Sequence, residues 1–279
     1  MTIIDYAKWD RQVERLRQSY LSAEPFPSIC LDNFLEPEIA DRVWSEFPPV
    51  ESKDWTHYAH VNERKLAQTR RETIPPTPLA VIDELNSPRF IAFLNKLSGI
   101  DRLLPDESLA GGGLHQTARG GFLNVHADFT SHPRHSTWAR RVNVLIYFNK
   151  DWQESFGGHL QLWDGKATKC VRKILPVFNR CAIFSTSRSS FHGLPEPLNC
   201  PPGMTRKSIA LYYFTEEAGR PLTRPTEYVP KPDDTSLQRI LIRADNMALR
   251  TFDFAKRRLG VTDQAIGKVL RIFSKGDTG

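Results

Sequence analysis

Residues 120–129 read Gly120-Gly121-Phe122-Leu123-Asn124-Val125-His126-Ala127-Asp128-Phe129, and this stretch decides how the chain is interpreted. It places an imidazole and a carboxylate two positions apart. Alternate side chains of a β-strand project to the same face, so His126 and Asp128 could bind one metal ion without a bend in the backbone. A pair of this kind is common by chance, and a metal site needs at least one further ligand.

The candidate for the third ligand is a second histidine much later in the chain. His192 follows the apolar run 181–184, which reads as a strand, and the small polar stretch 185–190. We therefore expect it near the end of a strand or in the loop after it. Two histidines and one carboxylate form the facial triad of non-haem Fe(II) oxygenases, which leaves coordination positions open for a cosubstrate and dioxygen.

A fixed positive charge opens a later strand. Arg206 begins the apolar, aromatic-rich run 206–214. A guanidinium buried at the end of a strand needs an anion, and its planar fork suits a carboxylate. A shift of one residue would give this position to Lys207. Alternation along the strand instead favours Arg206, on the face of Ser208 and Ala210.

With these residues in this order, the chain resembles the Fe(II)/2-oxoglutarate-dependent dioxygenases, in particular the prolyl 4-hydroxylase-like branch. The resemblance covers residues 108–216 and includes Tyr147 and the run Gly157-Gly158-His159-Leu160. It implies that the metal ligands are His126, Asp128 and His192, and that Arg206, helped by Tyr147, pairs with the distal carboxylate of 2-oxoglutarate.

The resemblance also implies weaker cosubstrate contacts. Relatives often carry a tyrosine ten positions before the first iron ligand, and this chain has Gln116 there, whose amide could replace the phenol as a hydrogen-bond donor. Asn143 shares the strand parity of Tyr147, so it could face the cosubstrate too. Leu160 is the remaining candidate contact, and we expect no catalytic residue beyond the metal site.

The activity implied by the resemblance is hydroxylation of an aliphatic carbon, in a prolyl residue or a small metabolite, with release of succinate and CO2. Its cofactors are Fe(2+) and 2-oxoglutarate, with L-ascorbate as a further candidate. Asp128 favours hydroxylation over halogenation, because a small residue in its place would leave room for a halide. One alternative is a non-oxygenase metal-binding cupin-like protein, although the clustered H-x-H of cupins is missing. Another is a catalytically silent binding module.

The periodicity predicts an α+β fold, with a double-stranded β-helix (jelly roll) core and flanking N-terminal and C-terminal helices. Strand-like alternation starts at Leu114, and Asp164-Gly165 is a hairpin signal. We divide the chain into N-terminal support (1–107), the jelly-roll core (108–216) and a C-terminal proline-rich connector with helices (217–279). The expected helices lie at 3–21, from 36, at 88–98, at 235–259 and at 262–273 with Thr262 as N-cap, whereas residues 50–80 are polar and poorly periodic.

Composition agrees with a cytoplasmic enzyme. The formal net charge is +6 over 279 residues, and the four cysteines show no C-x-x-C spacing. Neither a signal peptide nor a membrane span is expected, and nucleic acid is not an expected partner. The basic C-terminal residues are interpreted as a solvated helix face, with an acidic partner as the alternative, and a homodimer is a candidate assembly. Histidines at 57 and 60 are expected on the surface, with the lining of a substrate entrance as the alternative. Those at 132 and 135 are expected to be solvated, although either could contact substrate or compete for the metal, and His159 is expected to be structural.

Overall fold

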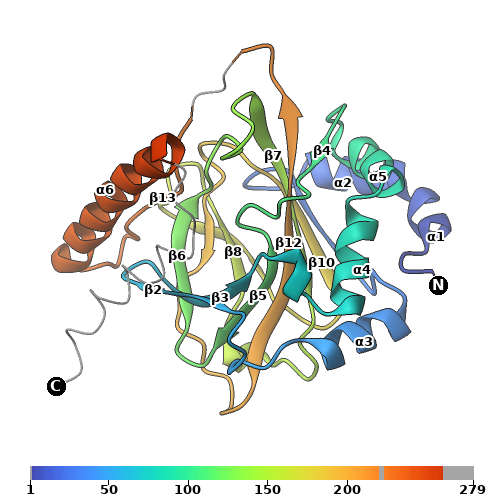
Figure 1. Cartoon of the computed structure of the whole chain (residues 1–279), viewed down its shortest axis with the longest axis horizontal. Coiled ribbons are helices and arrows are strands. Elements are labelled where there is room, and N and C mark those ends of the chain that lie inside the picture. The colour runs from blue at the N-terminus through green and yellow to red at the C-terminus, as the bar shows by residue number, and fades with distance from the viewer. Residues whose placement is uncertain (1, 220–222, 260–279) are drawn as a thin grey trace.

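The computed structural model describes residues 2–219 and 223–259. Its described residues form 13 strands joined in one antiparallel sheet, which curls round so that two halves face each other (Figure 1). The main path through the sheet is β1-β10-β7-β12-β5-β3-β6-β11-β8-β9, and β2, β4 and β13 pair at its sides. Side chains from both halves line one cavity of about 220 Å³. This arrangement confirms the predicted α+β fold with a jelly-roll core.

Strands dominate the chain from residue 113 onward, close to the start at Leu114 that the sequence predicts. Those before this point are β1 (Ser28–Asp32), β2 (Thr56–His60), β3 (Glu63–Gln68) and β4 (Leu104–Pro105). The later ones are β5 (Gly113–Ala118), β6 (Phe122–Ala127), β7 (Trp138–Tyr147), β8 (Leu160–Trp163), β9 (Cys170–Ile174), β10 (Arg180–Ser185), β11 (His192–Leu194), β12 (Thr205–Glu216) and β13 (Glu227–Tyr228).

Five helices cover the outer face of the β10-β7-β12 side (Figure 1). They are α1 (Tyr6–Asp10), α2 (Val13–Leu21), α3 (Pro37–Glu46), α4 (Pro76–Leu85) and α5 (Pro88–Ser98). Helix α5 has the predicted bounds because both of its ends are encoded locally. Ser87 caps the first turn by accepting from the Phe90 amide, and Gly99 ends the helix in a left-handed conformation with φ of 71°. The apolar face of α5 then packs into the main core.

Two N-terminal expectations were wrong. The single helix expected over 3–21 is two helices, α1 and α2, separated at Arg11 and Gln12. The polar stretch 50–80 contains a β-hairpin, β2 and β3, and helix α4. The hairpin lacked an apolar alternation because the inward face of β3 carries Glu63 and Lys65, which line a polar part of the cavity rather than an apolar core.

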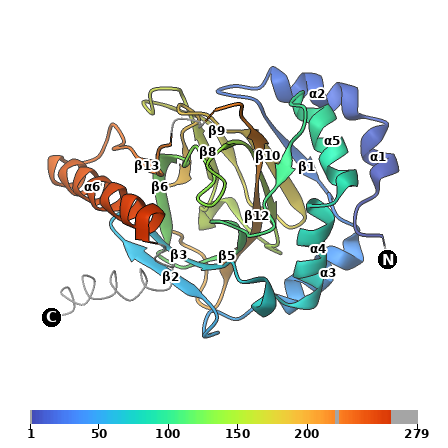
Figure 2. The same ribbon diagram turned by 45° about the horizontal axis from the view of Figure 1, so that its top comes forward.

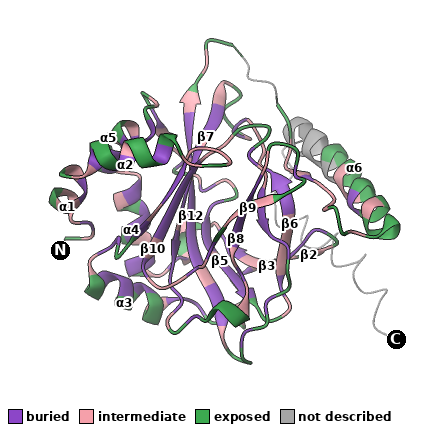
Figure 3. Ribbon diagram, turned by 180° about the vertical axis from the view of Figure 1, so that it is seen from behind, coloured by how far each residue is buried: buried purple, intermediate pink, exposed green. Residues whose placement is uncertain are grey.

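Helix α6 (Ser236–Leu259) lies apart from the other helices, beside β13 and β6 (Figure 2). It confirms the helix predicted over 235–259, whereas the second helix predicted at 262–273, with Thr262 as N-cap, falls outside the described residues. Most of its described surface is exposed, in contrast to the buried strands (Figure 3). In the described ranges, none of the helices combines the length and apolar character that crossing a membrane requires.

Candidate metal and cosubstrate site

Strand pairing brings the three predicted metal ligands together. His126 on β6 and His192 on β11 are direct register partners in neighbouring strands, and their ring centroids are 4.5 Å apart. Asp128 follows the end of β6, on the face of His126. Its Oδ1 lies 3.7 Å from His126 Nε2 and its Oδ2 3.4 Å from His192 Nε2. One ligand atom from each of the three residues lies within 4.8 Å of the others.

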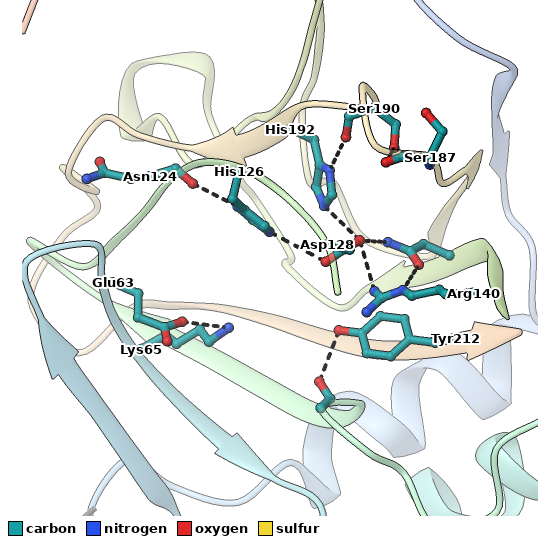
Figure 4. A network of polar contacts seen from close by, with 12 residues as sticks. Glu63, Lys65, Asn124, His126, Asp128, Arg140, Ser187, Ser190, His192 and Tyr212 are labelled. Atoms are coloured by element: carbon teal, nitrogen blue, oxygen red, sulfur yellow. Dashed lines mark hydrogen bonds and ion pairs between the residues drawn. The ribbon is translucent and has the colours of Figure 1, made fainter. Parts of the chain in front are cut away.

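Both imidazoles are oriented by the backbone of their own strand. Nδ1 of His126 lies 2.8 Å from the Asn124 carbonyl, and Nδ1 of His192 lies 2.9 Å from the Ser190 carbonyl (Figure 4). A carbonyl can only accept, so each Nδ1 carries the proton and each Nε2 keeps its lone pair. The lone pairs of both rings are therefore free to bind a metal, and the outer hydrogen bonds hold the rings in place.

Asp128 is held by two residues of β7. Asn143 Nδ2 donates to Oδ2 at 2.8 Å, and Arg140 forms an ion pair with the same oxygen at 3.0 Å. Arg140 also donates to Asn143 Oδ1 at 3.0 Å, and its guanidinium lies over the Tyr212 ring at 3.4 Å. Burial would raise the pKa of Asp128, but the Arg140 charge and both histidines hold it well below its usual range. The carboxylate is thus ionised, as a metal ligand must be.

The second histidine is held in its neutral form. Burial lowers the pKa of His192 to about 4, because a charged imidazole would lose its hydration inside the protein, and this effect exceeds the opposing pull of Asp128. A neutral imidazole is the form that binds a metal. The site therefore combines an anionic carboxylate with a neutral histidine across a wide range of pH.

Arg206 lies deeper in the same cavity, at the start of β12, and only 4% of its surface is exposed. Its Nε donates to the Gly158 carbonyl at 2.8 Å. A side chain at Gly158 would meet Leu198 at 2.7 Å and Arg206 at 3.1 Å, and the φ of 73° there also favours glycine. The Gly157-Gly158 pair thus lets the loop approach the guanidinium closely. Tyr147 packs against it, with the guanidinium carbon 4.8 Å from the ring centroid.

The Tyr147 hydroxyl and the Arg206 guanidinium interact with each other, but each keeps unused hydrogen-bonding capacity. Arg206 Nη2 and the Tyr147 hydroxyl are buried, and neither makes a hydrogen bond of normal geometry with any described residue. Burial raises the pKa of Tyr147 to about 12, so its hydroxyl keeps its proton. Leaving buried donors unpaired costs free energy, and a carboxylate would satisfy both. The residues present therefore fit a metal and, in the same cavity, a carboxylate.

We expected the Gln116 amide to face the cosubstrate, but Gln116 lies on the other face of β5. His115 and Thr117 of β5 line the cavity, so Gln116 points to the opposite side of that strand, where its amide donates to Thr205 Oγ1 at 2.7 Å. Lys207, the alternative to Arg206, donates to the same hydroxyl at 2.9 Å and is equally turned away. Counting ten positions back from His126 missed the cavity face by one residue.

The other candidate contacts have separate outcomes. Leu160 lines the cavity near Phe184, as a contact with an aliphatic cosubstrate chain requires. Asn143 also lines it, but its amide is engaged with Asp128. His132 is fully buried with Nε2 3.2 Å from Asp106, so it is structural.

The remaining histidines also lie outside the metal group. His135 and His57 are exposed, as expected at the surface for the latter. His159 lies 2.8 Å from Glu154. His60 was expected at the surface, but its side chain is only 8% exposed.

Arg140 is the functional residue that the sequence did not reveal. Simple alternation back from Asn143 places Arg141, not Arg140, on the cavity face. The ladder between β7 and β12 shifts at this point, because Tyr213 pairs with Val142 but Phe214 pairs with Arg140. This bulge leaves Arg141 as the extra residue and turns Arg140 inward. A bulge depends on pairing with a distant strand, so the local pattern carries no signal for it.

Comparison with known proteins agrees with this geometry. Residues 112–214 match the family model described as the 2OG-Fe(II) oxygenase superfamily. The chain is 29% identical over 147 residues to the mouse protein "Prolyl 3-hydroxylase OGFOD1". That alignment covers 51% of this chain but 24% of the relative, so the chain matches about a quarter of the relative's length.

Solved structures share the fold at low identity. A prolyl hydroxylase of Trichoplax adhaerens, solved with a hypoxia inducible factor peptide, gives a TM-score of 0.56 at 18% identity, over 75% of this chain and 91% of that one. A Pseudomonas putida prolyl-4-hydroxylase gives 0.52 at 14% identity, over 74% and 100%. Residues 112–214 are thus similar to the 2OG-Fe(II) oxygenase superfamily, and the chain shares the fold of these two prolyl hydroxylase structures.

Proposed function

We propose that the protein is an Fe(II)- and 2-oxoglutarate-dependent hydroxylase of an aliphatic carbon. The observation that carries this proposal is the convergence of His126, Asp128 and His192 on one point, in a cavity that Arg206 also lines with an unpaired Nη2. A metal site alone would also suit a cupin-like protein. The buried donors of Arg206 and Tyr147 favour the oxygenase, because they call for a second, carboxylate-bearing ligand.

In this function, His126, Asp128 and His192 hold Fe(II) through their two Nε2 atoms and a carboxylate oxygen. Asn143 fixes the orientation of the Asp128 carboxylate through a hydrogen bond of 2.8 Å, and Arg140 keeps it ionised through an ion pair of 3.0 Å. These β7 residues therefore act as positioning residues. The arrangement leaves the cavity side of the metal position open for other ligands.

Arg206 and Tyr147 bind the distal carboxylate of 2-oxoglutarate, and Leu160 contacts its aliphatic chain. The apolar side chains of Leu145 and Phe184 line the same cavity and limit access of water. When bound, iron and 2-oxoglutarate together activate dioxygen and supply the oxidant that hydroxylates a C–H bond, with release of succinate and CO2. The protein itself binds the metal and 2-oxoglutarate, orients them, and shields them from water.

For the substrate, we propose a prolyl residue in a peptide, with a small metabolite as the alternative. The similarity to a protein named as a prolyl 3-hydroxylase supports the prolyl class. The homodimer, the cytoplasmic location and an L-ascorbate requirement stay predictions. The free state of Cys30, Cys170, Cys181 and Cys200 is consistent with a reducing compartment.

The test measures succinate released from 2-oxoglutarate by purified protein with Fe(II), together with binding of Mn(II) by calorimetry. We expect wild-type protein to bind Mn(II) and to form succinate, and His126→Ala or Asp128→Ala to lose both. Arg206→Met should keep Mn(II) binding but weaken 2-oxoglutarate binding by about ten- to a hundredfold, as the loss of a charge-assisted pair predicts.

His135→Ala is the matched control, because His135 is an exposed histidine close in sequence to the metal ligands. It should behave like wild type. Mn(II) and 2-oxoglutarate binding without any succinate would indicate a silent binding module instead. Metal binding that is indifferent to His126→Ala would overturn the proposed site. A peptide panel screened for the mass gain of one oxygen then identifies the substrate.

A further inference from the structure

The inward face of β3 carries two charged residues that the proposed reaction does not use. Glu63 and Lys65 alternate with outward residues along this strand and line the same cavity as the metal ligands. Their side chains are 9% and 18% exposed. Removing two charges from water is costly, and a buried ion pair often contributes no net stability. A pair retained at this place suggests a role in binding.

The Lys65 ammonium is only partly satisfied. Nζ lies 2.9 Å from Glu63 Oε2 and 5.5 Å from the centroid of the Tyr58 ring. An ammonium has three N–H donors, and within the described part of the chain Lys65 Nζ has one acceptor oxygen in ion-pair contact, from Glu63. Figure 4 shows the pair on a different strand from the three metal ligands, facing the same space.

Lys65 and the three metal ligands line the same cavity. Burial would lower the pKa of the Lys65 ammonium, but Glu63 first, then Tyr212 and Asp128, raise it. Lys65 is therefore charged and lies within electrostatic reach of the carboxylate that binds the metal. The Lys65 ammonium can therefore donate a charge-assisted hydrogen bond to an acceptor that enters the cavity.

A chain of polar contacts connects Lys65 to helix α6. Glu63 Oε1 lies 3.0 Å from His60 Nε2, and His60 Nδ1 lies 3.1 Å from Asp245 Oδ2 on α6. Asn62 Nδ2 donates to the same Asp245 oxygen at 2.6 Å. Each member is mostly buried, so these contacts join α6 to the cavity wall through polar groups.

We propose that Lys65 binds an acceptor oxygen of the substrate, either a peptide carbonyl or a free carboxylate, and that Glu63, His60 and Asp245 are positioning residues for its ammonium. This proposal rests on the proposed oxygenase function. The two sources of the oxygen share one chemistry, since both accept from a cation, and they differ in whether the substrate is a peptide or a free amino acid.

The test is calorimetric binding to full-length protein loaded with Mn(II) and 2-oxoglutarate, using two probes: acetyl-Gly-Pro-Gly-amide and free L-proline. We expect wild-type protein to bind one of them. Binding of the peptide assigns the oxygen to a carbonyl, and binding of L-proline assigns it to a carboxylate. Lys65→Met should weaken binding of that probe by about ten- to a hundredfold, whereas Lys65→Arg, which keeps a cationic donor, should recover most of it.

The matched control is Arg64→Met, because Arg64 is the exposed neighbour on the opposite face of β3. It should change probe affinity by less than about twofold. Asp245→Asn should lower the affinity for the probe but not the affinity for 2-oxoglutarate or Mn(II). General destabilisation would lower all three affinities.

Three results would overturn the inference. Wild-type protein could bind neither probe, Lys65→Met could bind the probe as tightly as wild type, or Arg64→Met could lose as much affinity as Lys65→Met. Failure of the proposed function looks different, because wild-type protein would then bind no 2-oxoglutarate or form no succinate.

Discussion

Helices α1–α5 and helix α6 are attached to the same sheet by different physical means. The five N-terminal helices pack apolar faces against the outer side of the sheet, in a core that includes Phe34, Phe90 and Tyr213. Helix α6 contributes Ile242 as its buried apolar residue among those described, and is otherwise held by polar contacts from Asp245 and Asn246.

The apolar helices support the sheet, whereas α6 is attached to it through groups that can titrate. Apolar packing is insensitive to pH and salt, and it makes the β10-β7-β12 wall a rigid base for Arg140, Asn143 and Arg206. Attachment through buried charges depends on protonation, so the stability of the contacts between α6 and the sheet depends on pH. Asp245 of α6 contacts His60 and Asn62 of the β2–β3 hairpin, at the wall where we place substrate binding, whereas Asn246 bonds the backbone of Tyr228 on β13.

The largest effect is expected from a mutation in the apolar core beneath helices α1–α5. Phe90→Ala should lower the free energy of unfolding by about 3–5 kcal/mol, because the ring is fully buried and its loss leaves a cavity. Urea denaturation followed by circular dichroism measures this change. Ile242→Ala on α6 is the comparison variant and should cost clearly less. Equal costs would mean that apolar packing holds both regions, and the contrast drawn above would be wrong.

A pH titration tests the polar contacts that attach α6 to the sheet. Burial alone would lower the pKa of His60, but hydrogen bonds with Asp245 and Glu63 raise it to about 9, from an ordinary value of 6.5. Because the folded value is the higher one, this stabilisation is complete below about pH 6.5 and is lost as pH rises through about 9. We expect a loss on the order of 1–3 kcal/mol in the free energy of unfolding.

The control for this titration is His60→Gln, which cannot titrate. Subtracting its stability profile from that of wild type isolates the contribution of His60 from those of all other groups. The difference should be largest at low pH and should vanish at high pH. A flat difference between pH 6 and 10 would contradict the charged contact between α6 and the hairpin.

A smaller effect tests α6 directly. Asp245→Asn keeps the shape of the side chain but removes its charge, and should cost about 1–2 kcal/mol of α6 docking. Hydrogen exchange of the α6 amides should become faster, while exchange in α5 stays unchanged. Faster exchange in both helices would show that the two regions unfold as one unit.

The smallest effect comes from a polar contact on the apolar side. Arg89 and Asp10 form an ion pair whose side chains are 46% and 31% exposed. Arg89→Met should cost less than about 1 kcal/mol, because exposed pairs are screened by water and salt. Thermal unfolding measures it. A cost above that of Asp245→Asn would reverse the order that burial predicts.

Much of the fold follows from local rules. The caps at Ser87 and Gly99 bound helix α5, and alternation of side chains places His126 and Asp128 on one face of β6. The same alternation selects Arg206 over Lys207. These features depend on residues within a few positions of each other, where backbone geometry sets the direction of each side chain.

Only the tertiary structure decided the rest, because it depends on contacts between distant strands. A bulge against β12 turns Arg140 toward Asp128, and the register of β5 gives the cavity face to His115 rather than Gln116. The path from Lys65 to Asp245 joins residues 180 positions apart, and no local period encodes it. Periodicity specifies which residues share a face, whereas strand pairing determines what that face meets.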